Sequence, residues 1–294
     1  MPTISMTAFT HKEIFMQHLS IVPFSSGCGA LIDNLQLATC TDTEVDLLRQ
    51  ASSEFGVLFF RNQVLPPHEH LRFGRRFGNV VVNKFFQHLT EYPEIAEVRK
   101  EKQQETNIGG GWHTDHSYDD IPAMGSILVA RQVPSRGGAT HFANLYAAYD
   151  DLSDGLKKVL HSLTAIHSND HLYGESGYYA KTDLANQLQG QDSVSEATHP
   201  VVIVHPRSGR KALYVNPAHT IGITGWSQEE SRALLNYLYE HAAQSKYICQ
   251  FNWETDSVAL WDNRCTWHFA QNDYHGEARL MHRLTIEGTR LVGV

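Results

Sequence analysis

The chain is poor in the features that mark exported and membrane-bound proteins. Its only four cysteines, Cys28, Cys40, Cys249 and Cys265, fall in no CxxC or zinc-type spacing. They are too few for a disulfide scaffold, so we expect reduced thiols in a cytoplasmic protein. No apolar run approaches the roughly 20 residues of a membrane span, and residues 1–20 lack a basic stretch followed by an apolar one. We therefore expect neither export nor a membrane partner.

Positive charge is also in short supply. Lys and Arg number 24 against 32 Asp and Glu, a net charge of -8, and no basic stripe is present that could neutralise phosphates. We therefore expect small-molecule substrates and no nucleic-acid partner. With 294 residues, of which 41% are hydrophobic, the chain can bury a sizeable core, and β-rich folds of this length commonly form one domain. The simplest expectation is a single domain, residues 1–294.

Short apolar runs separated by turn signals predict a mainly β fold with flanking helices. Capping boxes at Thr41 and Ser227, each followed three residues later by Glu, predict two helix starts, and Gly56 is expected to end the first helix. A further helix is predicted over residues 67–77. Strands are predicted over 57–61, 126–130, 201–204, 211–215, 247–253, 258–261 and 282–287, with His268 in the connection after a strand.

Residues 174–198 are unusually polar. They are rich in Gly, Ser, Gln and Asp, and Tyr178 and Tyr179 are their only aromatic residues. A loop this long inside a compact domain is usually functional or disordered. We interpret the segment as a lid that excludes water from a substrate site, with a plain flexible insert as the alternative.

The candidate metal ligands of the sequence are two histidines and one aspartate. In the Trp-His-Thr-Asp block at 112–115, the spacing of His113 and Asp115 places both side chains on one face if the segment is a strand. Taken alone the pair is weak evidence, because a solvated strand end explains it equally well. It gains weight from the C-terminal block Trp-Asp-Asn-Arg at 261–264, which is followed by Thr266, His268, Arg279 and Arg283.

In these blocks and their spacing the chain resembles the taurine and 2,4-dichlorophenoxyacetate dioxygenases, from about Leu58 to the C-terminus. The resemblance implies a double-stranded β-helix core of the jelly-roll, cupin-like kind. It implies Fe(II), the co-substrate 2-oxoglutarate and O2 as cofactors, with His113, Asp115 and His268 as the iron ligands. Two His and one carboxylate leave open positions on iron for the co-substrate and dioxygen. The carboxylate of Asp115 favours oxygen transfer, because halogenating relatives lack it.

The resemblance also implies binding residues for two organic ligands. Thr140 and Arg279 match the pair that holds the far carboxylate of 2-oxoglutarate, a role that suits a guanidinium because it can donate two parallel charge-assisted hydrogen bonds. Arg283 matches the residue that takes the anionic head of the prime substrate. The positions that contact taurine in the family are here Asn83, Phe86, Gly109, His116, Tyr118 and His219.

Most of these six residues differ from those of the taurine enzymes, so we do not expect taurine as the substrate. Phe86 could line the pocket or pack in the core, and His116 could contact substrate or hydrogen-bond to a neighbour. The length between Gly78 and Trp112 is closer to the branch of the family that cleaves phenoxyalkanoic acids.

We therefore predict a dioxygenase that hydroxylates a small anionic organic substrate and yields succinate and CO2. The substrate would be a sulfonate, a sulfate ester or an aryloxyalkanoate-like carboxylate, with C–S or C–O cleavage where the hydroxylated carbon bears sulfur or oxygen. The resemblance implies a dimer or tetramer. Two alternatives remain at this point. A metal-containing β-barrel that only binds a small anion would not need both Thr140 and Arg279, and a zinc hydrolase would work without oxygen.

Overall fold

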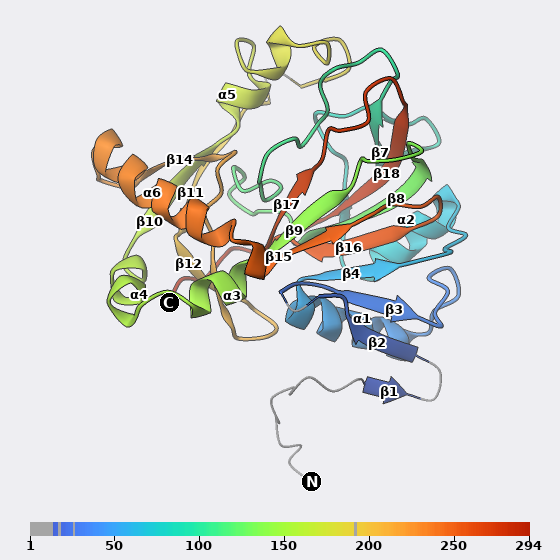
Figure 1. Cartoon of the computed structure of the whole chain (residues 1–294), viewed down its shortest axis with the longest axis horizontal. Helices are drawn as coiled ribbons and strands as arrows, with labels where there is room; N and C mark the ends of the chain where they lie inside the picture. The colour runs from blue at the N-terminus through green and yellow to red at the C-terminus, as the bar shows by residue number, and fades with distance from the viewer. Residues whose placement is uncertain (1–13, 17–18, 26, 191–192) are drawn as a thin grey trace.

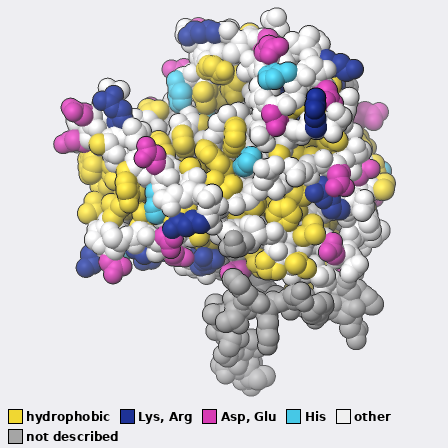
Figure 2. Space-filling view, in the orientation of Figure 1, with side chains coloured by type: hydrophobic (Ala, Val, Ile, Leu, Met, Phe, Trp, Pro, Cys, Tyr) yellow, Lys and Arg dark blue, Asp and Glu magenta, His cyan; other side chains and the backbone are white. Residues whose placement is uncertain are grey.

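The computed structural model describes residues 14–16, 19–25, 27–190 and 193–294 (Figure 1). This part of the chain is mainly β, with one ten-stranded sheet, two three-stranded sheets, one two-stranded sheet and helices around them. Most of residues 1–20, where we expect no export signal, lies outside the described residues. None of the described helices is long and apolar enough to cross a membrane. On the face drawn in Figure 2, Lys and Arg are scattered among Asp and Glu and form no continuous basic patch.

The ten-stranded sheet occupies the right-hand part of Figure 1. Its strands follow the order β1-β2-β3-β4-β16-β8-β18-β7-β6, and β5 pairs with β18. Neighbouring strands are antiparallel except for the parallel pair β3 and β4. The strand bounds are β1 Ile14–Met16, β2 Leu19–Pro23, β3 Ala30–Asp33, β4 Val57–Phe60, β5 Val80–Val81, β6 His88–Leu89, β7 Tyr92–Lys100, β8 Gly125–Gln132, β16 Val258–Asp262 and β18 Arg279–Ile286.

Two helices cover this sheet and bury its main apolar core. Helix α1 (Asp42–Phe55) begins with the predicted capping box at Thr41 and ends at Gly56, and α2 (Pro67–Arg75) packs against β7 and β18. Gly56 has a φ of 77°, and a Cβ there would lie 2.6 Å from the side chain of Thr266. This conformation and this close approach explain why glycine stands at the helix end.

A three-stranded sheet lies beside the large one and carries half of the site. Strand β9 (Thr140–Asn144) runs between β15 (Ile248–Phe251) and β17 (Thr266–Ala270). Along the chain β8 lies in the large sheet and β9 in the small one, and β15, β16, β17 and β18 alternate between the two sheets. Residues far apart in sequence are thereby brought next to each other, and an isolated bridge joins His113 to His268.

The segment between β9 and β15 forms the left-hand part of Figure 1 and surrounds a second apolar core. Its clearest helix, α6, starts at the predicted capping box of Ser227. The element bounds are α3 Leu145–Asp150, α4 Asp154–Leu160, β10 Thr164–Ser168, α5 Asp170–Tyr173, η1 Tyr179–Lys181, β11 Glu196–Pro200, β12 Val202–Val204, β13 Lys211–Leu213, β14 Thr220–Ile223, α6 Gln228–Ala242 and η2 Ser245–Tyr247.

Two local predictions were wrong. His268 lies within strand β17 and not in a connection. Residues 174–198 are not loop throughout, since they contain the short helix η1 and the start of β11, while residues 191–192 lie outside the described part. The condition that the block 112–115 forms a strand is not met, because only the bridge between His113 and His268 pairs it with the sheet.

Candidate active site

Three side chains that could hold a metal ion, those of His113, Asp115 and His268, meet where the block 112–115 pairs with β17. The Nε2 atoms of His113 and His268 each lie 3.6 Å from an oxygen of Asp115, and one donor atom of each residue falls within 4.8 Å of the others. Two backbone hydrogen bonds fix the crossing, with His113 N 3.1 Å from the carbonyl oxygen of His268 and His268 N 2.9 Å from that of His113. The bridge, and not the periodicity of a strand, therefore brings the three side chains together.

The protonation of these groups suits a cation. Burial lowers the pKa of both His113 and His268, so both imidazoles are neutral near pH 7. His113 Nδ1 lies 2.8 Å from the carbonyl oxygen of Gly111, so Nδ1 carries the proton and Nε2 keeps its lone pair for a metal. Burial alone raises the pKa of Asp115, but the charge of Arg283, with that of the two histidines when they are protonated at low pH, more than offsets this and holds it well below its usual range. Two neutral imidazoles and a carboxylate are a donor set that fits ferrous iron.

Arg283 reaches directly into this triad. Its Nη2 lies 2.6 Å from Asp115 Oδ2 and donates to the hydroxyl of Ser126 at 3.0 Å. The same hydroxyl lies 3.3 Å from Asp115 Oδ2, and Arg283 Nε has no hydrogen-bond partner among the described residues. A charged donor with spare hydrogen-bonding capacity therefore stands next to the metal-ligating groups, where an anionic substrate could meet it.

A second buried arginine has no partner for most of its guanidinium. Arg279 is only 5% exposed, and its Nε and Nη2 form no hydrogen bond with the described residues. Its guanidinium lies 5.8 Å from the ring centre of Trp253, whose Nε1 donates to Thr140 Oγ1 at 2.9 Å. Because an unpaired buried charge is costly, this arrangement fits an organic anion such as the far carboxylate of 2-oxoglutarate.

A cavity of about 540 Å³ opens beside His113. Of the predicted substrate residues, it is lined by Gly109 and His219. Tyr178 and Tyr179 of the proposed lid segment also line it, and the Tyr179 hydroxyl accepts a hydrogen bond from Gly109 N at 3.3 Å. The segment 174–198 thus contacts the loop that leads into the triad.

The other five predicted substrate residues, Arg283 among them, are not lining residues of this cavity. His116 lies 3.0 Å from Asp119 through Nδ1 and 3.4 Å from Asn83 through Nε2, so it hydrogen-bonds to its neighbours. Phe86 and Tyr118 are buried in a small apolar cluster, and the ring of Tyr118 lies 4.9 Å from that of His219. The cluster therefore packs against His219, one of the residues of the cavity wall.

Sequence reasoning missed several residues of the site. Tyr173 lines the cavity from α5, and Trp253 orients Thr140. Neither belongs to a motif, because their roles depend on strands and helices that approach only after folding. Trp112 lies in the Trp-His-Thr-Asp block and also lines the cavity, so the motif itself could have indicated it.

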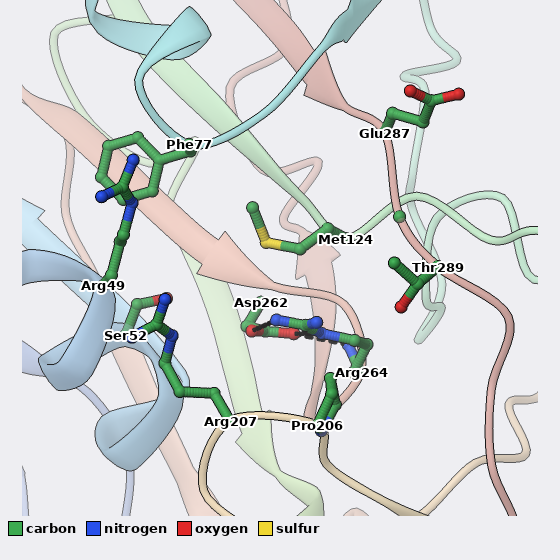
Figure 3. A pocket seen from close by; sticks show the side chains of 11 residues that line it. Arg49, Ser52, Phe77, Met124, Pro206, Arg207, Asp262, Arg264, Glu287 and Thr289 are labelled. Atoms are coloured by element: carbon green, nitrogen blue, oxygen red, sulfur yellow. Dashed lines mark hydrogen bonds and ion pairs between the residues drawn. The ribbon is translucent and has the colours of Figure 1, made fainter. Parts of the chain in front are cut away.

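A second cluster of possible metal ligands has a structural role. His205, Asp262 and Cys265 lie close together, but Asp262 pairs with Arg264 at 2.6 Å and with His205 Nε2 at 3.0 Å. His205 Nδ1 already accepts from the backbone N–H of Ser208, which leaves no lone pair for a metal. Figure 3 shows Asp262 and Arg264 together at the wall of a cavity of about 500 Å³. Asp262 and Arg264 of the C-terminal block therefore hold the fold in place.

Two neutral histidines and a carboxylate lie beside two buried arginines, each of which keeps guanidinium nitrogen without a partner among the described residues. On a mainly β fold, this donor set fits an oxygenase-type metal site with room for an organic anion. Residues 20–285 match the family model described as taurine catabolism dioxygenase TauD, TfdA family, and the chain belongs to this family. It is 32% identical to an alkylsulfatase of Acinetobacter baylyi, over 98% of this chain and 90% of the relative. It is 30% identical to an alpha-ketoglutarate-dependent sulfate ester dioxygenase of Pseudomonas putida, over 94% of this chain and 92% of that protein.

Solved structures agree with this assignment. The crystal structure of a taurine dioxygenase from Burkholderia xenovorans superposes with a TM-score of 0.79 at 32% identity, covering 94% of this chain and 91% of that one. AAD-2 in complex with Mn(II) and N-oxalylglycine superposes with a TM-score of 0.77 at 28% identity, covering 93% and 99%. The chain is thus an enzyme, a 2-oxoglutarate-dependent dioxygenase whose cofactors are Fe(II), 2-oxoglutarate and O2, and the predicted family and cofactors are confirmed.

Proposed function

We propose that His113, Asp115 and His268 bind ferrous iron, and that Thr140 and Arg279 hold the far carboxylate of 2-oxoglutarate. The observation that carries the proposal is the buried guanidinium of Arg279, which has two nitrogen atoms without a partner in the part of the chain that the structure describes. It lies close to Trp253, which in turn hydrogen-bonds to Thr140. Iron, when bound, supplies the site at which dioxygen is reduced as 2-oxoglutarate is converted to succinate and CO2 and one oxygen atom enters a substrate C–H bond.

The proposed prime substrate is a small organic anion with an uncharged alkyl or aryl part. Arg283 would bind its anionic head, because this guanidinium lies at the triad and keeps a free Nε. Aromatic residues form much of the cavity wall, and among its described lining residues none is Lys or Arg. Such a wall favours an apolar tail over a second charge. The aromatic residues concerned are Trp112, Tyr173, Tyr178 and Tyr179.

Sulfate esters and aryloxyalkanoates satisfy both requirements. Relatives are named for such compounds, among them the sulfate ester dioxygenase and an (S)-phenoxypropionate/alpha-ketoglutarate-dioxygenase of Delftia acidovorans. Hydroxylation of the carbon that bears the ester or ether oxygen would give an unstable product that collapses to a carbonyl compound and releases sulfate or a phenol. Fixing the anion at Arg283 would determine which carbon is presented to the iron.

The proposal includes four finer features of the architecture. The two sheets between which the chain alternates would form a double-stranded β-helix, within one domain spanning residues 1–294. Residues 174–198 would act as a lid, supported by the contact of Tyr179 with Gly109. The assembly would be a dimer or tetramer, as the family resemblance implies, and light scattering on the purified chain would test this.

Oxygen uptake by the Fe(II)- and 2-oxoglutarate-loaded enzyme tests the substrate proposal. We would compare a medium-chain alkyl sulfate, 2-phenoxypropionate and taurine, and quantify sulfate or phenol release. The first two are expected to stimulate oxygen uptake and product release, and taurine is not. Preferential turnover of taurine would contradict the proposed apolar tail. Product release that does not require oxygen would instead support a hydrolase.

A further inference from the structure

Two buried cations lie directly opposite each other on neighbouring strands. The register of β7 with β18 pairs Lys100, the last residue of β7, with Arg279, the first residue of β18. Directly opposed residues of an antiparallel pair project from the same face of the sheet. Lys100 is 3% exposed and Arg279 is 5% exposed. Both charged side chains are therefore largely removed from the water that would solvate them.

Neither cation has its donors satisfied by the described residues. Lys100 Nζ forms no hydrogen bond, and neither do Nε and Nη2 of Arg279. The Lys100 ammonium lies 4.5 Å from the ring centre of Tyr274, which gives a cation–π attraction. A ring face offers no conventional acceptor for the three N–H donors of an ammonium. Burying such a group without an acceptor is unfavourable, so the surroundings of Lys100 and Arg279 are suited to binding an anion.

A chain of contacts connects Lys100 to the proposed 2-oxoglutarate site. Tyr274, whose ring contacts the Lys100 ammonium, also lies near Arg279. Burial raises the pKa of Tyr274, and the charge of Arg279 lowers it by a smaller amount. Arg279 lies near the ring of Trp253, and Trp253 hydrogen-bonds to Thr140. The ammonium thus belongs to the same group of side chains as the two residues proposed to hold the far carboxylate.

We propose that Lys100 is a second cationic ligand of the far carboxylate of 2-oxoglutarate, beside Arg279; this inference rests on the proposed function. A carboxylate offers about four acceptor positions, so it can bind a guanidinium and an ammonium together. Two buried cations make the second carboxylate a requirement for the co-substrate. A 2-oxo acid that ends in a methyl group would leave both charges unpaired.

Calorimetry on the full chain loaded with Mn(II), without oxygen, tests the inference. The probes are 2-oxoglutarate and 2-oxopentanoate, in which a methyl group replaces the far carboxylate. Lys100→Met should raise the Kd for 2-oxoglutarate about 10- to 100-fold, as expected for the loss of one charge-assisted hydrogen bond. It should leave the Kd for 2-oxopentanoate within about twofold, because that ligand never met the ammonium. Lys100→Arg should restore most of the 2-oxoglutarate affinity.

Matched controls separate this role from a structural one. Lys102→Met removes a charge from an exposed residue two positions further on and should leave both affinities unchanged. If Lys100→Met does not fold, Lys100→Gln takes its place in the experiment. Equal weakening of both ligands in the Lys100 variants would mean that Lys100 only supports the fold, and unchanged 2-oxoglutarate binding would also overturn the inference. If the wild-type chain itself fails to bind 2-oxoglutarate, the proposed function is the part that fails.

Discussion

Replacing Arg279 by methionine should weaken co-substrate binding without destabilising the ligand-free protein. The guanidinium has two buried nitrogen atoms, Nε and Nη2, that have no partner among the residues that the structure describes. If both donate to 2-oxoglutarate, each charge-assisted hydrogen bond contributes about 1.5–3 kcal/mol, so the variant should lose about 3–6 kcal/mol of binding free energy. That loss corresponds to a Kd raised about 150-fold or more. In the ligand-free protein the substitution removes an uncompensated buried charge, so its free energy of unfolding should stay equal or rise.

Thermal unfolding of the ligand-free variant, together with calorimetric titration by 2-oxoglutarate in the presence of Mn(II), measures both quantities. Arg290→Met is a suitable control because Arg290 is exposed and pairs with the exposed Asp120. A fall of several degrees in the melting temperature with co-substrate affinity retained would refute the reasoning. It would show that Arg279 stabilises the fold and does not bind the ligand.

Three further predictions concern the anion site, the lid and acid stability. Arg283→Gln should weaken prime-substrate binding about 10- to 100-fold yet spare 2-oxoglutarate turnover without substrate, as a comparison of the substrate KM with uncoupled succinate formation will show. Tyr179→Phe removes the hydrogen bond to Gly109 N and should raise the ratio of succinate formed to substrate hydroxylated, because a looser lid admits water. Burial lowers the pKa of His70 to about 3 from roughly 6.5 in the unfolded chain, so the unfolded chain binds more protons and stability falls as pH drops below 6.5. Between pH 8 and pH 5.5, the free energy of unfolding of His70→Leu should therefore fall by about 1.4 kcal/mol less than that of the wild type, as measured by urea titrations. A pH dependence equal to that of the wild type would contradict this.

The sequence was most informative where local chemistry decides the structure. The capping boxes at Thr41 and Ser227 correctly predicted both helix starts, since a side chain and a backbone amide three residues apart determine them. The placement of His268 was wrong because β17 is formed by pairing with β9, more than a hundred residues earlier in the chain. Such pairing leaves little trace in the local pattern.

The same distinction applies to the site. His113, Asp115 and His268 could be predicted because each belongs to a recognisable block, and the structure brings them together. Lys100 carries no motif, and its proximity to Arg279 follows only from the register of β7 with β18. Residues whose importance depends on strand register or on the packing of distant loops can be found only from the folded structure.

The central claim is that His113, Asp115 and His268 bind iron, and that Arg279 binds the far carboxylate of 2-oxoglutarate. Anaerobic titration of the purified chain with Fe(II) and then with 2-oxoglutarate, followed by visible absorption, tests this most directly. We predict a metal-to-ligand charge-transfer band that appears only when both are present, is absent when His113 and His268 are both replaced by Ala, and is much weakened in Arg279→Met. A folded wild-type protein that gives no band, or a band unchanged in both variants, would contradict the account.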